Sequence, residues 1–422
     1  MVYLALTLSA LVLLSLTVKL WGKIVWLAVP LLFLGFIYLI FPLVYFKILN
    51  FEIPYFTLLF IPAFIHLLAF LCNPRIRESS PDWLIIASFA CFVGYLLLSL
   101  LWTTNLEYGI RKFEIFGMRI FLPVMIMLTS KVQSRSLNYL GLAIQIIALI
   151  VAAELLFWKD DLSSERATIL GLNPIEVSRM GVLALVISLT NLSGLRGTTG
   201  LVSRGLVIAT AIFIIIMTAS RGPIIGLFCG LCVSCLMMFY HKGKYIIKYV
   251  AILMITVVIV VTPVVLKPET SYRYLNLITE SSTIKTDENV LGRMYLGKLG
   301  LRVFQNNPVV GKGLGGYFEP LGGSYDPKAP DRYPHNLIIE ILAEGGIVGL
   351  IFMAFLFIQL FKRIVEVDRY NFGAIFLFIT AFCFALASLD LSGNTEWLII
   401  GVALSRYSNF LANEASVLIR KT

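Results

Sequence analysis

Long apolar runs follow one another along the chain and are separated by short polar connections. Each run is close to the roughly 20 residues that a helix needs to cross a bilayer, so the pattern predicts membrane-spanning helices. We expect about twelve or thirteen of them, at residues 2–18, 24–46, 54–72, 83–102, 115–128, 137–158, 175–192, 205–218, 223–240, 245–266, 337–361, 372–389 and 397–411. The pattern therefore predicts an all-α fold, a polytopic integral membrane helical bundle.

One long polar interval, residues 267–336, interrupts the pattern because it mixes Pro, Gly, Asp, Arg and Lys and is too polar to cross a bilayer. It divides the chain into N-terminal transmembrane helices at residues 1–266, a large external loop at 267–336 and C-terminal transmembrane helices at 337–422. Within the loop, apolar residues recur at helical spacing over 292–305 and predict a helix. The Gly-rich stretch 311–316 predicts a flexible turn, and without a βαβ unit it is not a nucleotide-binding fingerprint.

Composition supports a membrane protein, because 59% of the residues are hydrophobic and 14% are charged. The net charge of +10 comes from short basic clusters in alternate connections, which is the positive-inside pattern and argues against nucleic acid as a partner. It places the interval 267–336 on the outer side of the membrane. One connection disagrees with the positive-inside pattern, because Arg111, Lys112 and Arg119 also fall outside. Either the number of predicted helices is wrong there or these charges serve a site.

Three arginines in external connections are candidate ligands for an anionic group. Arg221 lies in a tight hairpin between two apolar runs, where it either snorkels to lipid headgroups or holds phosphate oxygens through its planar guanidinium. Arg293 falls on a different face of the expected helix from Lys298 and Arg302, which suit a solvated or headgroup-facing side. Arg293 either faces inward or lies on a solvated face of its own, and the sequence alone favours the solvated face. Arg166 is a further external arginine with a possible supporting role.

His335 is the candidate catalytic residue. It lies at the end of the external loop and immediately before an apolar run, and an imidazole with a pKa near roughly 6.5 can accept a proton at neutral pH. Asn336 is a plausible cap for the helix that follows, and Glu340 and Glu344 lie one and two turns further on as possible supporting residues. The alternative is a histidine that merely ends the loop.

We expect no metal and no cofactor. The three histidines of the chain are isolated from one another, and the acidic pair Asp160-Asp161 has no obvious partner for a divalent cation. The six cysteines lie in or beside apolar runs and do not form a disulfide framework.

Several of these short motifs, taken in order, resemble the superfamily of O-antigen ligases and O-antigen polymerases. The motifs are Ser220-Arg221-Gly222, the stretch from Gly292-Arg293 to Asn307-Pro308, the Gly-rich turn at 311–315, and His335-Asn336 followed by Glu340, Glu344-Gly345-Gly346 and Gly349. The resemblance implies a metal-independent membrane glycosyltransferase whose donor is an undecaprenyl-diphosphate-linked glycan. It implies that Arg221 and Arg293 bind the diphosphate and that His335 removes the proton of the acceptor hydroxyl, with inversion at the anomeric carbon.

The acceptor separates two alternatives within that superfamily. A ligase transfers the glycan to a lipid A-core acceptor, whereas a polymerase transfers it to another lipid-linked repeat, and the motifs do not choose between them; we favour the ligase slightly. A third alternative, of another class, is a transporter or flippase for the same lipid-linked glycan. The histidine at the end of a large external loop argues against transport, which needs no base.

Overall fold

The computed structural model describes residues 83–117, 174–189, 197–218, 220–241, 288–317, 333–367 and 373–388, together with single residues and short pieces at 124, 145–156 and 254. These residues form helices and the turns that join them, and the described part of the chain contains no strand. The expected all-helical fold is therefore confirmed for this part.

Eight helices are described: α5 (Trp83–Ser99), α6 (Leu106–Phe116), α9 (Pro174–Leu189), α10 (Gly197–Thr218), α11 (Arg221–His241), α15 (Glu288–Asn306), α16 (Leu337–Val367) and α17 (Gly373–Ser388). Most of them begin within two residues of an apolar run that the sequence predicts. The α10 helix begins at Gly197 rather than Gly205, and α15 begins at Glu288 rather than Gly292. The α6 helix was not predicted, because it is a short amphipathic helix in a connection.

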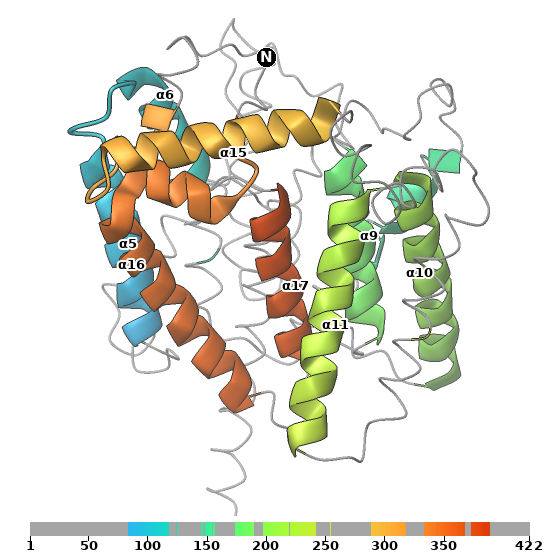
Figure 1. The fold of residues 1–422 in the computed structure, drawn as a ribbon. Helices are drawn as coiled ribbons and strands as arrows, with labels where there is room; N and C mark the ends of the chain where they lie inside the picture. The colour runs from blue at the N-terminus through green and yellow to red at the C-terminus, as the bar shows by residue number, and fades with distance from the viewer. Residues whose placement is uncertain are drawn as a thin grey trace, which may run out of the picture.

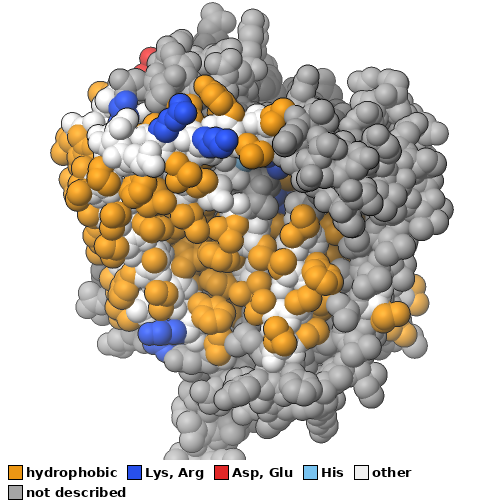
Figure 2. Space-filling model, in the orientation of Figure 1, with side chains coloured by type: hydrophobic (Ala, Val, Ile, Leu, Met, Phe, Trp, Pro, Cys, Tyr) orange, Lys and Arg blue, Asp and Glu red, His pale blue; other side chains and the backbone are white. Residues whose placement is uncertain are grey.

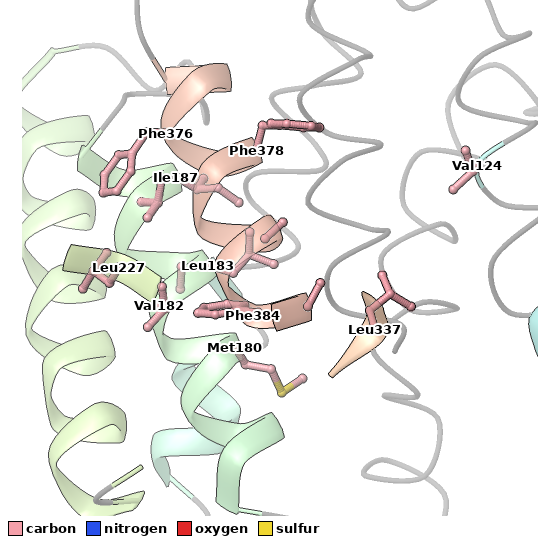
Figure 3. Packing of buried hydrophobic residues seen from close by; sticks show 14 of the residues in the cluster. Val124, Met180, Val182, Leu183, Ile187, Leu227, Leu337, Phe376, Phe378 and Phe384 are labelled. Atoms are coloured by element: carbon pink, nitrogen blue, oxygen red, sulfur yellow. The ribbon is translucent and has the colours of Figure 1, made fainter. Parts of the chain in front are cut away.

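Most of the helices run side by side, and α15 crosses one end of them (Figure 1). Large apolar side chains fill the space between the helices. Leu227 of α11, Val182 and Leu183 of α9, and Phe384 of α17 meet in one part of this core (Figure 3). The close contact of α11 with α17 depends on small residues, since a Cβ at Gly226 would lie 2.6 Å from the ring of Phe384.

Two of the described helices are long and apolar enough to cross a membrane, with spans at Leu201–Thr218 and Leu337–Val365. Two shorter apolar stretches, Trp83–Ser99 and Gly222–Leu236, lie in α5 and α11. Figure 2 shows apolar side chains covering the face below α15, with basic side chains along α15 and again at the opposite end. This distribution of apolar and basic groups is typical of a membrane protein.

The α16 helix is broken at Gly346, whose φ of 63° and ψ of −161° are not helical. Only glycine adopts such a conformation at little cost. The backbone groups freed by the break bond to the segment that follows α15: the amides of Ile347 and Val348 donate to the carbonyls of Pro308 and Val309, at 2.9 and 3.1 Å. The break is therefore a built feature that leaves these amides satisfied.

The Gly-rich stretch 311–316 is packed into the protein rather than exposed as a flexible turn. The amides of Lys312 and Gly313 donate to the carbonyls of Ala343 and Glu344, both at 2.9 Å, and the amide of Leu314 donates to the Ser99 hydroxyl at 3.1 Å. These amides bond within the protein and do not form a cradle for phosphate. The stretch instead joins α5 to the first half of α16.

Candidate functional site

The α15 helix crosses close to the first turn of α16, beside the predicted catalytic histidine. A Cβ at Gly300 would lie 2.5 Å from Cγ2 of Ile339 and 3.6 Å from Cγ of Pro334. Only a glycine allows this approach without a shift of the neighbouring side chain. The crossing brings α15 against Pro334, the residue before His335, and against Ile339 in the first turn of α16.

His335 occupies a left-handed backbone conformation, with φ of 54°, and it is the one non-glycine residue with positive φ in the described part of the chain. Such a conformation costs an L-residue about 1–3 kcal/mol, and it often marks a functional position. The imidazole lies against the ring of Tyr333, with 4.1 Å between ring centroids, and the residue is partly exposed. The turn therefore holds His335 at the edge of the protein, at the start of α16.

Asn336 fixes this turn to two helices at once. Its side-chain oxygen accepts a hydrogen bond from the amide of Ile339 at 3.1 Å, which is the N-cap arrangement that the sequence predicts. Its side-chain nitrogen donates to the carbonyl of Leu386 in α17 at 3.0 Å. The residue next to His335 is thus held by both α16 and α17.

Glu340 and Glu344 lie buried beneath this turn, where both pair with Lys112 of α6. The Lys112 ammonium contacts Glu340 Oε1 and lies 2.7 Å from Glu344 Oε2, and the three side chains are 5%, 1% and 3% exposed. Lys112 belongs to the connection whose basic residues depart from the predicted positive-inside pattern. Its charge serves a buried ion triad that ties α6 to the first two turns of α16.

The triad sets the charge state of its surroundings. Burial opposes the charge on Lys112, but the carboxylates of Glu340 and Glu344 outweigh it and raise the pKa of Lys112 above its ordinary value. Burial, together with the same two carboxylates, also raises the pKa of the Tyr317 phenol. The Tyr317 hydroxyl stays protonated and donates to the carbonyl of Leu296 in α15, at 2.9 Å.

Arg293 lies on the face of α15 that is directed toward α16. It precedes Gly297 by four residues and Gly300 by seven, so the three positions share one side of the helix, and Gly297 and Gly300 both face Ile339. Arg293 is partly buried, whereas Lys298 and Arg302 are exposed. The structure thus places Arg293 on a different face from Lys298 and Arg302, as the helical spacing predicted.

Arg221 is the first residue of α11, directly after the tight connection that follows α10. Its end of α11 is the end that carries His335, since Gly226 contacts Phe384 and Phe384 lies two residues from Leu386, which bonds to Asn336. The fold therefore brings the start of α11 to the same end of the bundle as the start of α16. Arg166 lies outside the described residues, as do Asp160 and Asp161.

Arg179 of α9 is a buried cation at this end that the sequence reasoning missed. It is fully buried, pairs with Glu176 one turn earlier, and lies over the ring of Phe384 with 5.8 Å from Cζ to the ring centroid. The signal was present in the sequence, because Glu176 and Arg179 are the charged residues of an otherwise apolar run. A charged residue in such a run is a default candidate for function.

A comparison with known protein families finds a match over the region that contains His335. Residues 206–354 match the family model described as O-antigen ligase, which supports the superfamily that the motifs resemble. The matched region contains Arg221, Arg293 and His335, with all of α11 and α15 and the first half of α16. No curated protein matches the chain.

Proposed function

We propose that this chain, which carries the O-antigen ligase domain at residues 206–354, is a polytopic glycosyltransferase of the bacterial inner membrane with its site on the periplasmic face. It transfers a glycan from undecaprenyl diphosphate to a sugar hydroxyl, and lipid A-core is the acceptor that we favour. The observation that carries the proposal is the strained, partly exposed His335, whose turn is capped into α16 and bonded to α17 beside the Arg293 face of α15.

The chemistry assigns one role to each kind of residue. The acceptor oxygen attacks the anomeric carbon, the new glycosidic bond forms, and the bond from that carbon to the diphosphate oxygen breaks with its electron pair. His335 takes the proton of the acceptor hydroxyl as the bond forms and then releases it to solvent. A single displacement inverts the anomeric centre.

Arg221 and Arg293 hold the diphosphate. A guanidinium presents a planar fork of donors that matches phosphate oxygens, and it stabilises the charge that grows on the leaving diphosphate. This stabilisation makes a metal ion unnecessary. The apolar helices around the site give the polyprenyl chain a path in the bilayer.

A deletion strain tests the overall activity. Loss of all glycan from lipid A-core, with accumulation of long lipid-linked chains, identifies a ligase on a gel of the surface polysaccharide. Retention of a single attached repeat identifies a polymerase. Unchanged surface polysaccharide rules out both enzymes.

Two variants of His335 test the catalytic role. His335→Ala removes the base, whereas His335→Asn keeps a residue that tolerates the left-handed backbone and still lacks a base. We expect both to abolish transfer at normal protein level. His241→Ala is the matched control because His241 ends α11 at the opposite end from Arg221. Normal glycan assembly in the two His335 variants would exclude His335 as the base and favour a transporter.

A further inference from the structure

The outward face of α15 alternates large apolar and basic side chains. Positions 291, 294, 295, 298, 301 and 302 lie on one side of the helix at spacings of three and four residues. The apolar members of this face are exposed by 40% to 60% of their surface: Leu291 42%, Met294 48%, Tyr295 60% and Leu301 41%. Lys298 and Arg302 are also exposed. We call these six residues the outer face of α15.

This composition does not suit a helix surrounded by water on its outer side. An apolar surface of several side chains is costly to leave exposed, and singly scattered apolar residues would not share one face. Apolar side chains with lysine and arginine beside them suit the boundary between acyl chains and headgroups, because a basic side chain can lay its apolar stem along its neighbours and keep its charge at the phosphates. The apolar side chains reach the acyl boundary while the basic ones stay with the phosphates.

The position of α15 in the fold agrees with a location in the headgroup region of the membrane. Figure 2 shows basic side chains along α15 and an apolar surface on the described helices below it. Exposed apolar residues continue below α15 on the helices that it crosses, with Leu97 and Leu98 on α5 and Ile347, Ile351 and Phe355 on α16. The α15 helix thus carries its basic side chains directly beside the apolar surface of the described helices.

We propose that the outer face of α15 docks on the anionic phospholipid headgroups of the outer leaflet. Lys298 and Arg302 lie one turn apart and provide two positive charges for the phosphates, while Glu288, at the first position of α15, is the one acidic residue of this helix. Charge complementarity therefore selects an anionic headgroup such as phosphatidylglycerol over a zwitterionic one.

Docking has a consequence for the opposite face of the same helix, where Arg293, Gly297 and Gly300 lie toward α16. A helix held by the bilayer on its outer side holds Arg293 in place on its inner side. Anionic lipid then sets the position of a diphosphate-binding residue, and this part of the inference rests on the proposed function. The lipid contact itself depends on the membrane topology in that proposal but not on the transfer reaction.

Hydrogen exchange in nanodiscs tests the contact without reference to activity. The full chain is placed in discs of phosphatidylcholine alone or of phosphatidylcholine mixed with phosphatidylglycerol, and exchange is followed over residues 288–306. We expect about tenfold slower exchange with phosphatidylglycerol, since each basic residue near an anionic surface shifts the equilibrium several-fold. The difference should shrink as salt is added, because these charges are exposed.

The double variant Lys298→Gln/Arg302→Gln should lose the difference between the two discs. Lys362→Gln, which removes an exposed lysine at the far end of α16, should keep it. Equal exchange of the wild-type helix in both discs would overturn the proposal, and so would a lipid difference that survives in the double variant.

A transfer assay in the same discs separates the two inferences. We expect wild-type transfer to be several-fold faster with phosphatidylglycerol and the double variant to lose that dependence. If exchange depends on anionic lipid while no disc supports transfer, the docking surface stands and the proposed function fails. If transfer occurs but neither exchange nor rate depends on the lipid, the function stands and the docking surface fails.

Discussion

Lys112 of α6 places its ammonium nitrogen 2.7 Å from Oε2 of Glu344, although the two residues are separated by 232 positions in the chain. Glu340 completes the contact from the turn before. The ion triad thus fastens an amphipathic connection to the helix segment that follows His335. Charges buried this deeply are tolerated because each has a partner of opposite sign.

Lys112→Met should be among the most damaging substitutions near the site. It keeps the length and apolar stem of the side chain but leaves two carboxylates buried without a cation, and breaking a buried ion pair in this way costs about 3–5 kcal/mol. We expect a large loss of thermal stability in detergent, which a thermal melt of the purified protein measures.

The triple variant Lys112→Met/Glu340→Gln/Glu344→Gln is the control for charge. It removes all three charges together, so it should be more stable than Lys112→Met alone. If Lys112→Met melts at the wild-type temperature, the triad does not hold α6 to α16.

The sequence predicted the long helices well because each has an apolar stretch that must be buried in the protein or lie in the bilayer. Such a stretch is visible as a run of consecutive apolar residues. The starts of α5, α9, α16 and α17 follow directly from it. The α6 helix was missed because it is short and amphipathic, and the residues that hold it in place lie more than 200 positions away in the chain. In the sequence Lys112 was recognisable only as a departure from the charge pattern. Its role in the ion triad depends on the fold, which brings Glu340 and Glu344 to it.

Gly346→Ala should destabilise the junction between the two parts of α16. A Cβ at this position would lie 2.3 Å from the carbonyl oxygen of Val309, and a φ of 63° with a ψ of −161° is a combination that essentially only glycine adopts, at a cost to an L-residue of about 1–3 kcal/mol before that overlap is counted. We therefore expect a loss of more than about 2 kcal/mol, measured as a lower melting temperature with reduced transfer.

Gly94→Ala in α5 is the matched control for Gly346→Ala. A Cβ there meets nothing within 4 Å, and the residue is helical, so alanine should leave stability unchanged or raise it by up to about 1 kcal/mol. Equal stability of the two variants would show that the break at Gly346 is not required.

Tyr317→Phe should change how stability depends on alkaline pH. Folding raises the pKa of Tyr317, so the folded state holds the proton of the phenol more tightly than the unfolded state does. Its contribution is therefore complete below the ordinary tyrosine pKa of about 10 and is lost as pH rises above it. The raised pKa of Lys112 acts with the same sign and over a similar window.

The phenylalanine variant keeps the ring in its buried position and loses the hydrogen bond to Leu296, at a cost of about 1 kcal/mol near neutral pH. The difference in melting temperature between wild type and variant should be constant from pH 6 to pH 9 and should narrow above about pH 10. A difference that stays constant at alkaline pH would show that Tyr317 does not titrate on unfolding.

The candidate site divides into a part that the sequence could predict and a part that it could not. Asn336 was predicted as a cap because capping depends on residues within one turn, and the structure confirms its bond to Ile339. Its second bond, to Leu386, depends on the packing of α17 and could not be predicted locally. The left-handed backbone of His335 is likewise imposed by the surrounding turn.

Arg293→Lys tests whether α15 supplies a guanidinium to the diphosphate. Lysine keeps the charge but loses the planar fork that binds two phosphate oxygens together, so transfer in detergent should fall by about ten- to a hundredfold, which corresponds to about 1.4–3 kcal/mol in the transition state. Arg302→Lys is the matched control from the same helix, because Arg302 lies on the exposed outer face and needs only its charge. The measurement is the initial transfer rate of each variant and of the wild type at equal protein level. If Arg293→Lys and Arg302→Lys are equally active, Arg293 does not bind the diphosphate bidentately, and its inward position on α15 serves packing against α16 alone.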